Sequence, residues 1–298
     1  MASHHLLTNF LGIHELSTAM FYKAAFAELA GTAILMISIC GSYTTLDQGH
    51  PQEPLVSAAC AGLAVAMIIW TFNHISGAHI NPSVSLSFMV TGQLSLVKTV
   101  VFIVMQCAGS IAGTAIVWYI IPDQWRGQIG ATVLGKDVTV AQGFVAEMIA
   151  TCFLILAVFA SSDKNRSDLG GSMPLTIGLV VVMQNTWAAR LTGCSMNPIR
   201  TLGPAVIAGV WDDHWLYWVA PTLGGVLGAL IYKYILAQHP SQACALMALC
   251  GDGNDGQTDK SMSFDNIAVA MGPVGQDSKH SYGSRAPIHR NSYVGLPS

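Results

Sequence analysis

The sequence predicts an all-α membrane protein, with six transmembrane helices plus two re-entrant half-helices in two inverted repeats. Two observations carry this prediction. Hydrophobic residues make up 52% of the 298-residue chain and charged residues only 10%, whereas soluble domains contain roughly 25% charged residues. In addition, the pair Asn-Pro occurs twice in apolar surroundings, as Asn81-Pro82-Ser83 and as Asn197-Pro198-Ile199.

Six apolar stretches are long enough to cross a bilayer, which takes about 20 helical residues. They cover about 21–44, 55–74, 96–121, 139–160, 174–192 and 214–237. Two shorter apolar pieces, at about 81–91 and 197–208, begin at the Asn-Pro pairs. Because they are too short to cross, we expect them to be half-helices that are buried in protein or line a water-filled cavity.

Each Asn-Pro pair predicts the first turn of a half-helix. Proline loses nothing there, because the N–H that it lacks would be unpaired in any case, and asparagine is a favoured N-cap. A single pair would be interpreted as a simple cap. Two pairs at matching places in two halves of one chain favour a pore with a site at the bilayer midplane.

The two halves of the chain repeat each other. Ala27-Glu28-Leu29 matches Ala146-Glu147-Met148, and each glutamate precedes its Asn-Pro pair by roughly 50 residues. Since each half has an odd number of spans, the second half must be inverted relative to the first. Ionisable groups inside spans are costly and usually functional. We expect Glu28 and Glu147 to accept hydrogen bonds from the backbone that leads into each half-helix, with a proton relay as the less favoured alternative.

Glycines at four-residue spacing predict close packing of the third and sixth spans. They are Gly109, Gly113, Gly224, Gly225 and Gly228. The bias of Lys and Arg in the short loops places both termini in the cytoplasm. We therefore expect a cytoplasmic N-terminal segment over 1–20, a membrane domain over 21–237 with repeats at about 21–121 and 139–237, and a disordered cytoplasmic tail over 238–298.

The chemistry-bearing residues do not indicate a metalloprotein or an enzyme. The seven cysteines form no Cys-x-x-Cys pair and the ten histidines show no metal-ligand spacing, so we expect no metal and no cofactor. No nucleophile–base pair stands out within the spans, and we expect no nucleic-acid partner.

Five stretches make the chain similar to the aquaporin, or major intrinsic protein, family over about residues 20–237. They are AEL, HISGAHINPSVS, DLGGSMPLTIGL, TGCSMNPIRTLGPA and HWLYWVAP, of which the last three most resemble the animal water-channel branch. The resemblance implies a homotetramer with one pore in each subunit. It also implies a multi-pass protein of the plasma membrane, with the lipid bilayer, water and small neutral solutes as its partners.

The resemblance places a narrow selectivity filter at Ala61, Asn185, Cys194 and Arg200. Arg200 would bind solute oxygens and repel cations. Water-specific relatives carry a bulky aromatic in place of Ala61 and a histidine in place of Asn185, so we expect a wider aperture here. A shift of one residue would put Gln184 or Thr186 in place of Asn185. Arg190 is an alternative filter cation, for which a surface role is favoured.

The function implied is a passive channel for water, and also for small neutral solutes such as glycerol or urea, that excludes protons and ions. Two positive half-helix ends would meet at the midplane, and the amides of Asn81 and Asn197 would orient each passing water. Ser83 and Ile199 replace the family's usual alanine, and we expect both to pack behind the caps. His79 is expected to support the cytoplasmic vestibule.

Other functions stay open at this stage. A strictly water-selective channel is favoured by residues typical of that branch, namely Thr201, Ala205, Tyr217 and Trp218. An ion-coupled carrier would need intramembrane acidic pairs and further spans, which the sequence lacks. A membrane-junction protein with the same fold is a third alternative, because the long tail permits a partner role.

Overall fold

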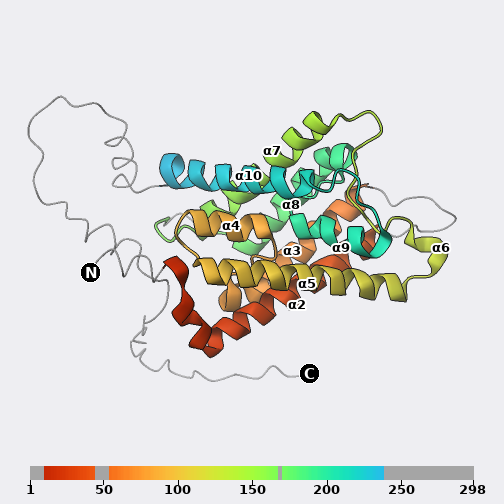
Figure 1. Ribbon diagram of the computed structural model, residues 1–298. Helices are drawn as coiled ribbons and strands as arrows, with labels where there is room; N and C mark the ends of the chain where they lie inside the picture. Colours follow the sequence, from red (N-terminus) through yellow and green to blue (C-terminus); the bar gives the residue numbers. More distant parts are fainter. Residues whose placement is uncertain (1–9, 44–53, 167–169, 238–298) are drawn as a thin grey trace, which may run out of the picture.

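A computed structural model describes residues 10–43, 54–166 and 170–237, and the regular elements of these ranges are helices (Figure 1). The predicted tail over 238–298 and residues 1–9 of the predicted N-terminal segment lie outside the described residues. A short 3₁₀ turn, Ile13–Ser17, precedes the first long helix.

Six long helices occur in the part of the chain that the structure describes, each within two residues of a predicted span. They are α2 (Ala19–Ser42), α3 (Pro54–Ser76), α5 (Leu96–Ile120), α7 (Val140–Ser162), α8 (Met173–Thr192) and α10 (Leu216–Ile231), which continues as a π-helical turn, Tyr232–Leu236. Five of the six are long and apolar enough to cross a membrane. The exception is α8, in which Gln184, Asn185 and Arg190 lower the hydropathy.

Three shorter helices complete the described chain. The half-helices α4 (Pro82–Val90) and α9 (Pro198–Ala208) begin at the prolines of the two Asn-Pro pairs, as predicted, and α6 (Asp123–Arg126) is a single turn after α5. The two half-helices lie toward opposite ends of the bundle, with α4 near the N-terminal turn and α9 toward α6 (Figure 1).

Four of the long helices, namely α2, α5, α7 and α8, begin at side-chain caps that the local sequence provides. The hydroxyl of Thr18 accepts the amide hydrogen of Phe21 at 3.3 Å, and Ser95 caps α5 in the same way. Thr139 and Gln142 form a complete capping box at the start of α7. Such caps satisfy amide groups that have no partner within the helix, so helix starts follow closely from local sequence.

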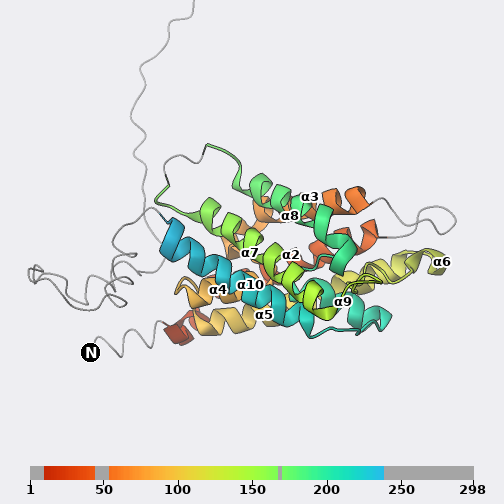
Figure 2. The same ribbon diagram turned by 90° about the horizontal axis from the view of Figure 1, so that it is seen from above.

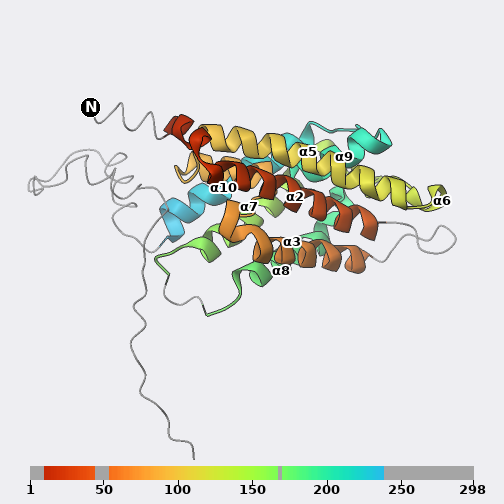
Figure 3. The ribbon, with the colours of Figure 1, turned by 90° about the horizontal axis from the view of Figure 1, so that it is seen from below.

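The two halves pack in the same way, seen from above in Figure 2 and from below in Figure 3. In the first half α2 packs against α3 and α5, and in the second half α7 packs against α8 and α10, while α3 and α8 join the halves. Helices α2 and α7 run in opposite directions through the bundle (Figure 1). The predicted arrangement of two inverted repeats is therefore confirmed.

Glycines allow the closest helix crossings, as their spacing predicted. The α-carbon of Gly109 lies against the carbonyl oxygen of Leu29, and Gly224 lies in the corresponding position against Met148. Gly113 and Gly228 repeat these contacts one turn further along each helix. A β-carbon at any of the four positions would overlap a backbone oxygen, so only glycine permits this spacing.

Candidate functional site

The two loops that lead into the half-helices share an unusual backbone. In each loop a glycine with positive φ is followed by two residues that also adopt positive φ, a conformation that costs about 1–3 kcal/mol for each non-glycine residue. The values are 89°, 47° and 44° for Gly77, Ala78 and Ile80, and 79°, 47° and 52° for Gly193, Cys194 and Met196. Strong contacts with the surrounding helices must hold these loops in place.

Glu28 of α2 holds the first loop. Its Oε1 accepts hydrogen bonds from the Ser76 hydroxyl at 2.6 Å and the His79 amide at 2.9 Å. Its Oε2 accepts from the Ile80 amide at 2.7 Å and from Gln106 Nε2 at 2.8 Å. The carboxyl group is fully buried, and these four donors satisfy it.

Glu147 of α7 holds the second loop in the same manner. Its Oε1 accepts from the Thr192 hydroxyl at 2.6 Å and the Ser195 amide at 2.8 Å, and its Oε2 accepts from the Met196 amide at 2.8 Å. Three donors therefore replace the four around Glu28. The place on α10 that corresponds to Gln106 is Pro221, whose side chain has no donor.

The two asparagines of the Asn-Pro pairs cap their own half-helices and also join the two repeats. Asn81 Oδ1 accepts the Ser83 amide at 2.8 Å, while Asn81 Nδ2 donates to the carbonyl of Met196 at 2.9 Å. Asn197 Oδ1 accepts the Ile199 amide at 3.2 Å, and Asn197 Nδ2 donates to the carbonyl of Ile80 at 2.9 Å. Each amide carries two hydrogens, so one remains for a molecule in the adjoining cavity.

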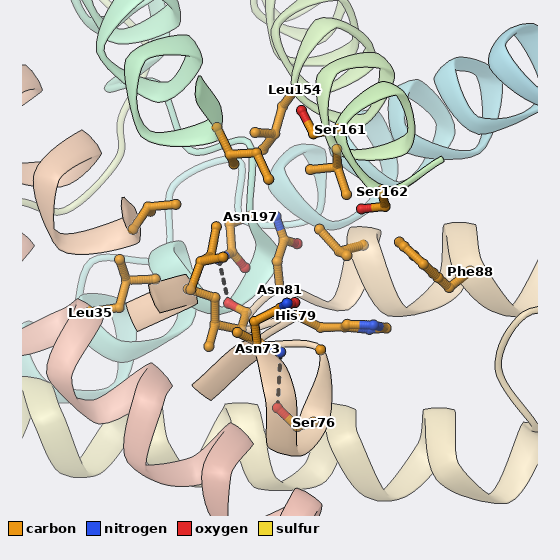
Figure 4. A pocket seen from close by; sticks show the side chains of 18 of the residues that line it. Leu35, Asn73, Ser76, His79, Asn81, Phe88, Leu154, Ser161, Ser162 and Asn197 are labelled. Atoms are coloured by element: carbon orange, nitrogen blue, oxygen red, sulfur yellow. Dashed lines mark hydrogen bonds between the residues drawn. The ribbon is translucent and has the colours of Figure 1, made fainter. Parts of the chain in front are cut away.

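A cavity of about 960 Å³ passes the two asparagines, whose side chains lie close together in Figure 4. On the side of α4 its lining includes His79, Lys98 and Asp163. On the side of α9 it includes all four predicted filter residues, Ala61, Asn185, Cys194 and Arg200. The fold thus brings together side chains from both repeats around one continuous space.

The geometry distinguishes Asn185 from its neighbours. Asn185 lines the cavity, and its Nδ2 donates to the carbonyl of Val181 at 2.9 Å. Gln184 is fully buried with its Oε1 accepting from Trp187 at 2.7 Å, and Thr186 is exposed. Arg190 is likewise exposed and is not part of the cavity lining, which fits its favoured surface role.

Arg200 is a buried cation that two contacts hold in the cavity wall. It is 3% exposed, its Nη1 donates to the carbonyl of Gly130, and its guanidinium lies over the ring of Tyr43 at 5.3 Å. Within the described ranges, no carboxylate forms an ion pair with it. Its remaining donors can therefore bind oxygen atoms of a molecule in the cavity.

Thr201, the residue after Arg200, takes part in a hydrogen-bond network next to the cavity. The hydroxyl of Thr201 lies 2.7 Å from that of Thr132 and 2.8 Å from that of Ser195. This network connects the loop that contains Gly130 to the second half-helix. Ser110 of α5 adds a hydrogen bond to the carbonyl of Ile199.

Sequence reasoning did not identify the contributions of Tyr43, Gly130, Thr132 and Ser110. The glycines between α5 and α7 signal a structured loop there, but nothing local indicates that this loop meets Arg200. Ser83 and Ile199 are fully buried and lie outside the cavity lining. His79 lines the cavity, and its Nδ1 lies 3.1 Å from the Ser85 hydroxyl. Among the described residues, no cluster of side chains could hold a metal ion.

Comparisons with known proteins match this architecture. The family profile described as "Major intrinsic protein" matches residues 15–232. Aquaporin-4 of Mus musculus is 39% identical over 223 residues, covering 73% of this chain and 68% of that protein. Aquaporin-1 of Mus musculus is 36% identical over 265 residues, covering 87% of this chain and 98% of that protein.

A solved structure shares the fold. The X-ray structure of the aquaglyceroporin from Plasmodium falciparum superposes with a TM-score of 0.64 and 24% identity, covering 77% of this chain and 99% of that one. The profile match spans most of the chain, and the aquaporins named above are 36% and 39% identical to it over the aligned residues. The chain therefore belongs to the major intrinsic protein family and is an integral membrane protein.

Proposed function

We propose that this protein is a passive channel for water and for small neutral solutes such as glycerol or urea, and that it excludes protons and ions. The observation that carries the proposal is the cavity that passes two opposed half-helix N-termini, with Asn81 and Asn197 in its wall. The relatives are named aquaporins, which agrees with a water channel.

Exclusion of protons and cations follows from the centre of the cavity. Each half-helix places roughly half a positive elementary charge at its N-terminus, and both ends face the space beside Asn81 and Asn197. A cation would lose hydration there while facing this positive potential. A water molecule that accepts a hydrogen bond from each free amide hydrogen would be oriented so that it cannot relay a proton in either direction.

Passage of solutes larger than water follows from the two small filter residues that line the cavity together with Arg200. Ala61 and Asn185 present a methyl group and a neutral amide to the cavity, so the ring is wider than one with an aromatic and a histidine. The Val181 carbonyl occupies one hydrogen of the Asn185 amide. The other hydrogen and the amide oxygen can pair with a solute hydroxyl or carbonyl, and the free donors of Arg200 can bind solute oxygens in the same cavity.

The residues that favour strict water selectivity have other places in the structure. Thr201 and Ala205 are buried outside the cavity lining. The Tyr217 hydroxyl donates to the carbonyl of Thr192 at 2.9 Å and so supports the second loop. These residues support the walls, whereas the aperture depends on the side chains that face the cavity.

The test is to restore bulk with the double variant Ala61→Phe, Asn185→His. Purified protein in liposomes should pass water, glycerol and urea under an osmotic step, and the double variant should keep water passage while losing most solute passage. A matched control is Leu63→Phe with Thr186→His, because both positions lie on the same two helices and are exposed on the outer surface. Solute-impermeable parent protein, or a double variant as permeable as the control, contradicts the filter assignment.

Ion exclusion is measured in the same vesicles. A pH gradient and a potassium gradient should decay no faster than in empty liposomes.

We also propose that the protein assembles as a homotetramer in the plasma membrane with both termini cytoplasmic. Native mass spectrometry of the detergent-solubilised protein tests the assembly, and protease access to the termini in intact cells tests the orientation.

A further inference from the structure

An aromatic side chain stands beside Arg200, although α3 provides only Ala61 there. Tyr43, at the C-terminal end of α2, lines the cavity together with Ala61 and Arg200. Its ring centre is 5.3 Å from the guanidinium carbon of Arg200. The aromatic surface at this end of the cavity therefore comes from a different helix.

Tyr43 is held in this place by its neighbours. Its amide donates to the carbonyl of Cys40 at 3.2 Å, which closes the last turn of α2. The backbone of Gly130 packs against the ring so closely that a β-carbon there would lie 2.8 Å from Tyr43 Cδ2. The carbonyl of the same Gly130 accepts the hydrogen bond from Arg200. Ring, glycine and guanidinium thus form one packed unit.

The position of Tyr43 along the pore is set by the start of α3. The Ser57 hydroxyl donates to the carbonyl of Ser42 at 3.1 Å, which joins the end of α2 to α3. Ser57 precedes Ala61 by one helical turn, a rise of about 6 Å. Tyr43 therefore lies beyond the ring formed by Ala61, Asn185, Cys194 and Arg200, on the side away from Asn81 and Asn197. We call this end of the cavity the outer entrance.

We propose that Tyr43 determines the size limit of this channel. The flat ring and the guanidinium lie against each other in the cavity wall, so a solute must pass along this packed unit before it reaches the wider ring at Ala61. This inference rests on the proposed function, namely that small neutral solutes enter the pore.

The experiment measures water, glycerol and erythritol permeability in liposomes containing the parent protein, Tyr43→Ala or Tyr43→Phe. Glycerol and erythritol are linear polyols, and erythritol is the larger by one CH(OH) group. Tyr43→Ala should raise the ratio of erythritol to water permeability severalfold, while Tyr43→Phe should keep the parent's ratio because the ring remains. Tyr119→Ala is the matched control, since that side chain is 85% exposed on the outer surface of α5.

The outcomes separate this inference from the proposed function. A parent protein that passes no glycerol contradicts the proposed solute range, yet Tyr43→Ala that then admits glycerol supports the role of Tyr43. A parent protein that passes glycerol, with Tyr43→Ala unchanged relative to Tyr119→Ala, overturns the inference. If Tyr43→Ala does not fold, Tyr43→Leu is judged by the same ratio.

Loss of the Tyr43 ring could raise erythritol permeability either by widening the entrance or by releasing Arg200. Proton conductance distinguishes these two causes. Our inference expects a larger size limit with proton exclusion intact, because Gly130 still holds the guanidinium. Erythritol passage that appears only together with a proton leak overturns it, since that result reports a displaced Arg200. Equal effects of Tyr43→Phe and Tyr43→Ala also overturn it, because the hydroxyl alone would then set the limit.

Discussion

The exchange Glu147→Gln tests whether the buried carboxylates act as supports for the pore loops. Glutamine keeps the shape of glutamate but replaces one acceptor oxygen with an NH₂ donor. If its oxygen stays at the Oε1 position, the bonds from Thr192 and Ser195 survive. The new NH₂ then faces the Met196 amide across the 2.8 Å that separates it from Oε2 in the native protein, so two donors oppose each other.

The expected loss of stability comes from the contact between the side chain at position 147 and the Met196 amide. A hydrogen bond to a charged group contributes about 1.5–3 kcal/mol, and Met196 also adopts a positive φ of 52° that the bond helps to hold. For a domain of this size, about 2–4 °C of melting temperature corresponds to 1 kcal/mol. We therefore expect the midpoint of thermal unfolding to fall by about 3–12 °C.

A functional consequence follows, because the carbonyl of Met196 accepts the hydrogen bond from Asn81. Movement of Met196 would weaken the link between the repeats, so water permeability per folded protein should fall together with stability. The assay is thermal unfolding by fluorescence in detergent, paired with stopped-flow osmotic shrinkage of liposomes. Asp212→Asn serves as control, since Asp212 is exposed. Unfolding of Glu147→Gln at the control's temperature would refute the supporting role.

Three further predictions concern packing, thiol access and pH. Gly224→Ala should destabilise the protein by about 1–3 kcal/mol, as overpacking does, because the new methyl group overlaps the Met148 carbonyl. Gly41→Ala, with open space at the β-carbon, should be neutral or stabilising, and equal unfolding temperatures for the two variants would contradict this packing argument. Mercurials should block transport because Cys194 lines the cavity, and undiminished inhibition of Cys194→Ser would place the reactive thiol elsewhere. Burial lowers the pKa of His214, which lies between α9 and α10 and accepts the Trp218 indole N–H at 3.0 Å. The unfolded chain therefore binds a proton more readily, so stability is fully present above the usual histidine pKa of about 6.5 and falls as the pH drops toward the lower folded value. Across this pH range, the unfolding temperature should fall less on acidification for His214→Gln than for the parent protein. An equal fall in the two proteins would exclude His214 as the source of the acid destabilisation.

The positions of the helices were predictable because their causes are local. A bilayer requires backbone groups to be satisfied within each segment, so an apolar stretch of sufficient length indicates a helix regardless of its neighbours. The starts at Pro82 and Pro198 follow from asparagine caps and from the missing proline N–H. The match between Glu28 and Glu147 likewise revealed the repeat before any contact was known.

The sequence by itself therefore determined the spans, the half-helix starts and the pairing of the two halves. Tertiary structure alone decided which groups meet in the cavity. The bond from Asn81 to the carbonyl of Met196 joins residues 115 apart, and Arg200 meets Gly130 and Tyr43 from two other segments. Such contacts depend on how the helices cross and on how close glycines allow their backbones to approach. No local pattern records that geometry, which is why Tyr43 became visible as part of the entrance only in the folded chain.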